Sequence, residues 1–256
     1  MTIRTEQEII GMKQASEAAA KTLRLMKNYC APGMTTRDVD QYGGEIIKSC
    51  GARSAPILAY RFPGFTCISV NEVAAHGIPS SNKVLKNGDL VNIDVSVELD
   101  GYWSDNGCSF VLGEDYFHLS DLVNASKTIL KEAIDLICHN YKISNLGGFI
   151  ESQATAKGYQ VIRNLNGHGI GKSLHEDPRE IANYKDILNI RKFKKDMVVA
   201  IETFISTKST QVKAEKDGWS LVGTKGGFVT QHEHTILITE EKPIILTAAN
   251  GIWENI

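Results

Sequence analysis

Four acidic side chains interrupt segments of the chain that otherwise look like buried β-strands. Asp94 and Glu202 each lie within a run of β-branched and aliphatic residues, and Asp105 and Glu233 occupy similar positions in two further strand-like segments. Carboxylates are poor strand formers and are almost never fully buried unless they are paired. These positions therefore call for a positive partner that could hold several negative charges together.

A hairpin between the segment of Asp94 and the segment of Asp105 would bring these two side chains to one face of a sheet. Asp100-Gly101 is a two-residue turn signal between the strands. With these residues as the loop, Asp94 faces Gly107, and Asp94 and Asp105 become diagonal neighbours about 7–8 Å apart at most. A bulge or a three-residue loop would break this parity. The expected spacing suits two side chains that share a bound cation.

Divalent cations are the partners that best fit these carboxylates. Without them, like charges in one cavity would repel until some carboxylates take up protons. Two divalent ions would neutralise the four acids. Together with an imidazole, such a site suits Mn²⁺, Fe²⁺, Co²⁺ or Zn²⁺, and two ions about 3.5–4 Å apart are the usual arrangement for metal-assisted hydrolysis.

Each candidate taken alone also has a simpler interpretation. A single strand acid such as Asp94 usually faces solvent, and Glu202 could be an exposed edge residue. His232 and His234 flank Glu233, so they should point to the opposite face of their strand and are not expected to be ligands. A lone loop histidine is more often a surface residue than a ligand, which applies to His76, His168 and His175. The coincidence of all these positions favours the metal hypothesis.

The glycine-rich segment Gly167–Ser173 ends in Gly-Lys-Ser, as phosphate-binding loops do. That motif needs a glycine where Asn166 stands, and a dinucleotide fingerprint needs a glycine where Lys172 stands. Nucleotide binding is therefore not expected. The glycines are expected instead to let a loop turn so that His168 faces the cavity.

Composition excludes several classes of protein. The chain has 256 residues, 42% of them hydrophobic, with 28 Lys+Arg against 30 Asp+Glu and a net charge of −2. This balance disfavours direct nucleic-acid binding and disorder. There is no apolar run of about 18 residues and no secretory signal, so we expect a cytoplasmic protein without membrane contact. The five cysteines form no Cys-x-x-Cys pair, which argues against a disulfide framework or a thiolate zinc site.

The order of predicted elements is the same in the two halves of the chain. Thr5 and Glu8 read as a capping box that starts the first helix. Two helices followed by strands are expected in each half: helices from about 6 to 30, 36–50, 118–139 and 145–157, and strands 65–70, 90–99, 102–112, 159–164, 197–205 and 229–239. We therefore predict an α+β protein with one domain, 1–256, and an internal pseudo-repeat of about 1–115 and 116–256. The helices should cover one face of a curved, mainly antiparallel sheet.

Several motifs, in this order and spacing, resemble the type I methionine aminopeptidases of bacteria. They are TCISVNEVAAHGIP (66–79), NIDV (92–95), NGHGIG (166–171), LHEDP (174–178) and EHT (233–235). The resemblance covers nearly the whole chain. It implies the pita-bread fold, in which two pseudo-symmetric α-α-β-β halves enclose a centre of two divalent metal ions (Co, Mn, Fe or Zn).

The resemblance also implies a role for each candidate residue. The metal ligands would be Asp94, the bridging Asp105 and Glu233, His168 and Glu202. Glu202 would in addition transfer protons. His76 and His175 would contact the scissile amide and stabilise the developing oxyanion.

An apolar pocket for a methionine side chain is expected next to this centre. Its candidate residues are Phe62, Phe65, Cys67 and Trp219, of which Cys67 and Trp219 match the family pattern best. Unbranched, polarisable methionine fits a narrow aromatic slot that rejects branched chains. For Phe62 and Phe65, ordinary packing in the core is an equally good interpretation.

The implied activity is removal of the initiator methionine from nascent proteins and peptides with a small second residue. The partners would be the N-termini of nascent polypeptides and, transiently, the ribosome. The protein would act as a monomer. Two alternatives remain: a proline-directed aminopeptidase or dipeptidase of the same fold, and a metal-free binding protein on this scaffold. Two departures from the family pattern, Thr203 in place of proline and Asn106 in place of a threonine or small apolar residue, put rate and metal preference in question rather than the reaction.

Overall fold

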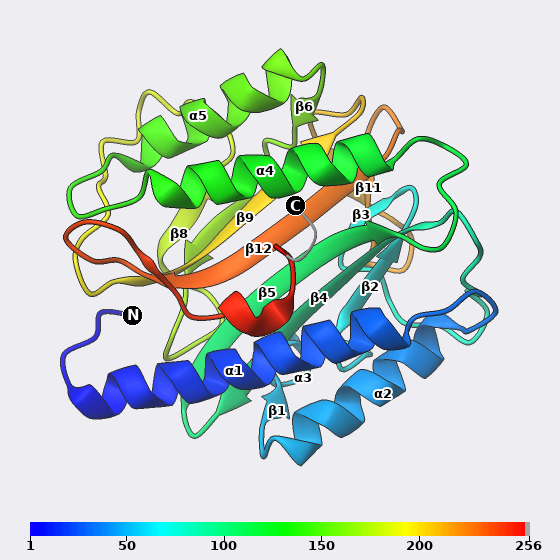
Figure 1. The fold of residues 1–256 in the computed structure, drawn as a ribbon, viewed down its shortest axis with the longest axis horizontal. Helices are drawn as coiled ribbons and strands as arrows, with labels where there is room; N and C mark the ends of the chain where they lie inside the picture. Colours follow the sequence, from blue (N-terminus) through cyan, green and yellow to red (C-terminus); the bar gives the residue numbers. More distant parts are fainter. Residues whose placement is uncertain (254–256) are drawn as a thin grey trace.

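The computed structural model describes residues 1–253 and shows one large curved sheet with the four long helices packed on one face (Figure 1). The helices are α1 (Glu6–Tyr29), α2 (Thr36–Ser49), α3 (Ala55–Tyr60), α4 (Ser120–Asp135), α5 (Ile143–Ala156) and the short 3₁₀ helix η1 (Ala248–Asn250). In Figure 1, α1 and α2 cover one half of the sheet and α4 and α5 cover the other. Among residues 1–253, none of the helices combines the length and the apolar character that a membrane span requires.

The strands form a ten-stranded sheet and a smaller three-stranded sheet. The main sheet has the order β1-β4-β5-β12-β9-β7-β8, with β2 also on β4, β6 on β9 and β13 on β12; the small sheet has the order β10-β11-β3. All of the pairings are antiparallel. The bounds are β1 Arg53–Ser54, β2 Cys67–Val70, β3 Val73–Ala75, β4 Leu90–Leu99, β5 Tyr102–Val111, β6 Gln160–Val161, β7 Asn166–Gly169, β8 Glu176–Ala182, β9 Val198–Ser206, β10 Val212–Ala214, β11 Leu221–Gly223, β12 Val229–Leu237 and β13 Ile244–Ile245.

Each pair of long helices has its own hydrophobic core against the sheet. On one side Leu23 and Val39, from α1 and α2, pack with Ile93 of β4. On the other side Leu130 of α4 packs with Ile201 of β9. Since side chains alternate along a strand, the acids next to these apolar residues must leave the opposite face of the sheet, away from the four long helices. The pattern of burial thus decides which face carries the polar site.

The helix starts show one difference from expectation. Thr5 Oγ1 accepts from the backbone N–H of Glu8 at 3.2 Å, but the Glu8 carboxylate accepts from Arg4 N instead of closing a capping box on Thr5. A complete box is present at the start of α2, where Thr35 and Asp38 cap each other. The four main helices agree in place with the expected ones, with ends shifted by a few residues.

The hairpin between β4 and β5 has the expected register. Asp94 pairs with Gly107 and Asp105 pairs with Ser96 across the turn at Asp100. The two-residue loop therefore holds Asp94 and Asp105 on one face as diagonal neighbours.

The two halves of the chain meet where β5 lies beside β12. Direct pairing there is confined to Glu233 and the residue after it. At one end, Ser109 Oγ accepts from the Gln231 N–H at 2.9 Å. At the other end, Thr235 Oγ1 donates to the Asp105 carbonyl at 2.8 Å and accepts from its N–H at 3.0 Å. Side-chain hydroxyls thus complete the ladder on both sides of the junction.

Candidate metal centre

One cavity of about 450 Å³ brings the candidate site residues together, with the single exception of Phe65. It is lined by Phe62, Cys67, His76, Asp94, Asp105, His168, His175, Glu202, Trp219 and Glu233, among others. Phe65 is 40% exposed and its ring lies over Gly44 of α2. The interpretation of Phe65 as a pocket residue is therefore wrong. Its backbone N–H is fixed by the Asp40 carboxylate, and its side chain packs on the helix instead of lining the cavity.

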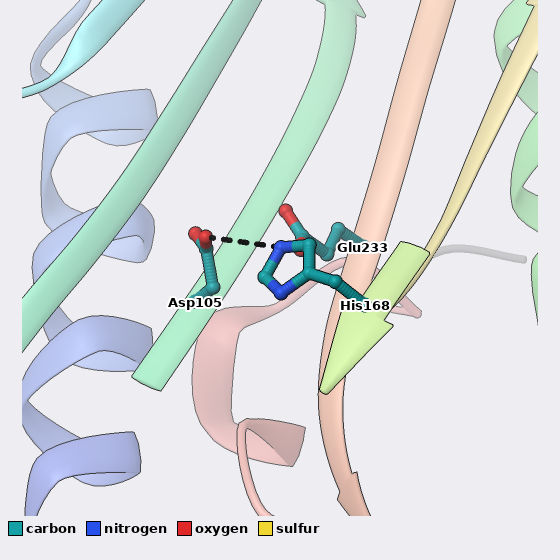
Figure 2. Close-up of side chains that lie close together, drawn as sticks. All are labelled: Asp105, His168 and Glu233. Carbon is teal, nitrogen blue, oxygen red and sulfur yellow. Dashed lines mark ion pairs between the residues drawn. The ribbon is translucent and has the colours of Figure 1, made fainter. Parts of the chain in front are cut away.

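The floor of the cavity is formed by Asp105, His168 and Glu233, which converge from β5, β7 and β12 (Figure 2). One ligand atom from each lies within 4.8 Å of the other two. Asp105 Oδ2 is 4.0 Å from His168 Nε2. The three side chains are nearly inaccessible to solvent, with exposures of 6%, 3% and 1%. Two carboxylates and an imidazole at such spacing can hold a transition-metal ion.

Asp94 and Glu202 flank this cluster from the two neighbouring strands. Glu202 pairs with Glu233 across β9 and β12, so both carboxylates leave the same face side by side. Burial raises the pKa of Asp94 to about 6, although a hydrogen bond with Asp105 lowers it. Burial, followed by the charges of Asp94 and Glu202, raises the pKa of Asp105 well above its usual range.

The same physics applies to the other two acids. Burial and then the charge of Asp94 raise the pKa of Glu202 well above its usual range. Burial and then the charge of Asp105 raise that of Glu233. Four acids that cannot all be charged next to one another need protons or cations.

The donor set fits a metal ion in two further respects. Within residues 1–253, Asp105 Oδ1 and Glu233 Oε1 are buried without a hydrogen-bond partner, as is expected of oxygens shaped to bind a cation. Burial, with His175 nearby, lowers the pKa of His168 to about 3, which keeps its imidazole neutral. His168 Nδ1 lies 3.0 Å from the Gly169 carbonyl, which can only accept, so the proton sits on Nδ1. The lone pair on Nε2 is then free for a metal.

His76 and His175 line the same cavity and both remain exposed to solvent. His76 follows β3 in the left-handed region, with φ of 54°. The His175 ring lies 4.1 Å from that of His168, and its Nδ1 is 2.6 Å from the Tyr60 hydroxyl. Nothing in the sequence pattern marked Tyr60, since its place beside His175 depends on the packing of α3. Both imidazoles are placed where they could donate to a substrate carbonyl.

The apolar wall of the cavity combines residues from both halves of the chain. The rings of Phe62 and Trp219 meet edge to face at 5.2 Å and 87°. Cys67 lies in β2 opposite Asp94, and only 8% of it is exposed. Phe204, which was not among the expected pocket residues, also lines the cavity. This slot suits an unbranched apolar side chain.

His168 lies within a strand, β7, and not in the expected loop. The glycines on either side of it allow neighbouring strands to approach closely, and they are not needed for a turn. A Cβ added to Gly167 would lie 2.6 Å from the Ala200 carbonyl oxygen, and one added to Gly169 would lie 2.4 Å from that of Asp177. Sequence alone could not separate these two uses of glycine, because both need a residue without a Cβ.

Replacing Gly169 by alanine should destabilise the protein. The added methyl group meets backbone, which cannot rotate away, so we expect Gly169→Ala to lower the free energy of unfolding in urea by about 1–3 kcal/mol. Gly148→Ala is a matched control, since its Cβ would first meet the movable Lys185 side chain. Equal stability of Gly169→Ala and the parent protein would contradict this account of β7.

The two departures from the family pattern are both hydrogen-bonded in the core. Thr203 Oγ1 donates to the His232 carbonyl at 3.4 Å, a contact across β9 and β12 that a proline could not make. Asn106 Nδ2 donates to the Val95 carbonyl at 3.0 Å, and its Oδ1 accepts from Asn250 at 3.0 Å. Both side chains are fully buried. Neither side chain belongs to the cavity lining.

His232 and His234 lie outside the cavity, as the alternation along β12 predicts. His232 Nδ1 is 2.9 Å from the Ser126 hydroxyl of α4, and His234 Nδ1 is 2.8 Å from the Thr247 hydroxyl. Both are thus fully buried on the helix side of the sheet.

The fold and the carboxylate and histidine centre together define a metallopeptidase of a known class. Residues 10–240 match metallopeptidase family M24, and the chain belongs to this family. It is 43% identical over 247 residues to methionine aminopeptidase 2 of Bacillus subtilis, an alignment that covers 96% of this chain and 99% of the relative.

Solved structures agree with this assignment. The crystal structure of methionine aminopeptidase from Thermotoga maritima superposes with a TM-score of 0.91 at 36% identity, covering 96% of this chain and 99% of that one. Prolidase from Pyrococcus furiosus superposes with a TM-score of 0.77 at 24% identity, covering 96% of this chain and 65% of the other. The second likeness concerns the fold alone. The fold is the pita-bread fold that the sequence motifs imply.

Proposed function

We propose that this chain is a metal-dependent methionine aminopeptidase, which hydrolyses the first peptide bond of proteins and peptides that begin with methionine and a small second residue. The observation that carries the proposal is the meeting, in one cavity, of a buried carboxylate and histidine centre and an aromatic slot. Its relatives in Bacillus subtilis and Thermotoga maritima carry this name.

The residues that would hold two divalent ions are Asp94, Asp105, His168, Glu202 and Glu233. Bound there, such ions would lower the pKa of a water molecule and withdraw electron density from the substrate carbonyl. Glu202, whose carboxylate lies beside that of Glu233, would in addition accept a proton and pass one to the leaving amine.

The other residues would bind and orient the substrate. His76 and His175 would donate hydrogen bonds to the carbonyl oxygen, where negative charge develops as water adds to the carbonyl carbon. Phe62, Cys67 and Trp219 would enclose the methionine side chain. The Tyr60 hydroxyl holds one nitrogen of His175, which leaves the other nitrogen for the substrate.

The substrate assignment is tested with short peptides and added Mn²⁺ or Co²⁺. We expect release of methionine from a Met-Ala peptide and little or no cleavage of Xaa-Pro peptides. Preference for Xaa-Pro peptides would favour the proline-directed alternative. Binding of methionyl peptides without cleavage, by a protein that takes up no added metal, would favour the metal-free binding protein. Because all five positions expected to bind metal carry a side chain able to do so, we do not favour the metal-free alternative.

The proposed substrate also suggests where the protein acts and with which partners. We propose that the chain acts in the cytoplasm on the N-termini of nascent polypeptides, as a monomer and with a transient contact to the ribosome. We further propose that 1–256 form one catalytic domain with a pseudo-repeat at about 1–115 and 116–256. The continuous sheet that joins both halves supports this view.

A further inference from the structure

The amide side chain of Gln231 connects the candidate ligand Glu233 with the other half of the sheet. Gln231 precedes Glu233 by two residues in β12, so both side chains leave the same face. Gln231 Nε2 donates to Glu233 Oε2 at 3.0 Å, and its Oε1 accepts from Asn92 Nδ2 at 2.8 Å. Gln231 and Asn92 are buried, with exposures of 1% and 4%.

The direction of this amide is fixed by groups that can only accept. Asn92 Nδ2 also donates to the backbone carbonyl of Gln231 at 3.2 Å, so a flip of the Asn92 amide would set two oxygens against each other. The NH₂ group of Asn92 therefore faces the amide of Gln231. The Gln231 atom nearest to it must be an acceptor, which is the oxygen Oε1. The NH₂ group of Gln231 therefore faces Glu233.

The sheet also leaves space for this side chain. Gly107 lies in β5 and pairs with Glu233 of β12. Strand β5 runs between β12, which carries Gln231, and β4, which carries Asn92. A Cβ at Gly107 would lie 2.2 Å from Gln231 Oε1. The glycine thus opens the path by which the amide of Gln231 passes over β5 to reach Asn92. Residues on three strands contribute to one hydrogen bond on Glu233.

We propose that Gln231 is a positioning residue for Glu233, and that Asn92 acts through it. The hydrogen bond occupies Oε2 and sets the carboxylate plane, while Oε1, which has no hydrogen-bond partner in the part of the chain that the structure describes, is left for a cation. Partners of metal ligands that orient them in this way commonly contribute about 10–100-fold to metal affinity or activity. The inference rests on the proposed role of Glu233 as a metal ligand.

The test is the affinity of the metal-stripped, full-length protein for Mn²⁺, measured by calorimetry. Gln231→Met keeps the length of the side chain and removes the N–H. We expect it to weaken Mn²⁺ binding by about 10–100-fold and to lower kcat on a Met-Ala peptide, with KM little changed. Gln14→Met, on the exposed face of α1, is the matched control and should bind Mn²⁺ as the parent does.

A double-mutant cycle distinguishes positioning from a general loss of structure. Asn92→Leu should weaken Mn²⁺ binding in the parent protein but add nothing in the Gln231→Met background, whereas independent structural defects would multiply. Mn²⁺ affinity of Gln231→Met within twofold of the parent, or losses that multiply, would overturn the proposal. If Gln231→Met does not fold, as judged by its melting curve, Asn92→Leu alone must weaken Mn²⁺ binding.

Failure of the proposed function would be recognised separately. A parent protein that binds Mn²⁺ but releases no methionine would refute the substrate assignment, and the comparison of Mn²⁺ affinities would still decide the role of Gln231.

Discussion

A strong chelator should abolish methionine release by the purified protein, and added Mn²⁺ or Co²⁺ should restore it. The cluster of Asp105, His168 and Glu233 offers carboxylate oxygens and a neutral imidazole nitrogen within 4.8 Å of one another. In the described part of the chain, two of these oxygens have no hydrogen-bond partner. Removal of the ions would take away several kcal/mol of transition-state stabilisation. We therefore expect the rate of methionine release to fall by at least about 10³-fold. Methionine release from a Met-Ala peptide is the measurement.

The control for this experiment is the same chelator saturated beforehand with metal, which should leave the rate unchanged. Elemental analysis of the protein before and after treatment must show that metal was present and was removed. Full activity of a protein shown to contain no metal would refute the metal-dependent reaction. The chelated protein should also melt at a lower temperature, because bound ions stabilise only the folded state.

The arrangement of Asp94 and Asp105 could be predicted from the sequence because it depends on local chemistry. Asp100-Gly101 forms a two-residue turn, and the period of two along each strand then decides which residues share a face. The observed pairs of β4 and β5 agree with that expectation. The same alternation correctly placed His232 and His234 on the face away from Glu233.

Other parts of the site depend on contacts between distant segments, which a single sequence does not contain. The strand that carries His168 is four residues long and consists of Asn-Gly-His-Gly, a composition that is typical of a loop. Only its fit between β8 and β9 makes it a strand. The sequence could not decide between the pocket and ordinary packing for Phe65, because its place depends on α2, where the Asp40 carboxylate accepts from its backbone N–H. Tyr60 reaches the site through the packing of α3, which the sequence did not indicate. Strand alternation puts Gln231 on the face of Glu233, but its hydrogen bond with Asn92 depends on the pairing of distant strands.

Asp105→Asn should abolish methionine release and, in the absence of metal, make the protein more stable. The substitution keeps the shape of the side chain but removes a candidate ligand charge, so we expect a rate at least about 10³-fold lower. It also removes one negative charge from a buried group of acids, and its new N–H₂ can donate to Asp94. At pH 8 the metal-free variant should be more stable by at least about 1 kcal/mol, or about 2–4 °C in melting temperature.

The sign of the pH dependence makes this gain in stability specific. Burial raises the pKa of Asp94 to about 6 in the folded chain, and burial followed by neighbouring charges raises that of Asp105 well above its usual range. Because the folded state then binds more protons than the unfolded state, the metal-free parent loses stability as the pH rises from about 4 through these raised values. The advantage of Asp105→Asn should therefore be large at pH 8 and small near pH 4.

Thermal melting of metal-free parent and variant at a series of pH values decides the matter. Asp100→Asn, at the exposed hairpin turn, removes the same charge outside the cavity and should leave activity and the pH dependence unchanged. A variant less stable than the parent at pH 8 would mean that the buried acids do not repel one another in the metal-free protein. Since that repulsion is the physical reason for expecting cations at the junction of the two halves, the result would remove the electrostatic basis of the metal centre itself.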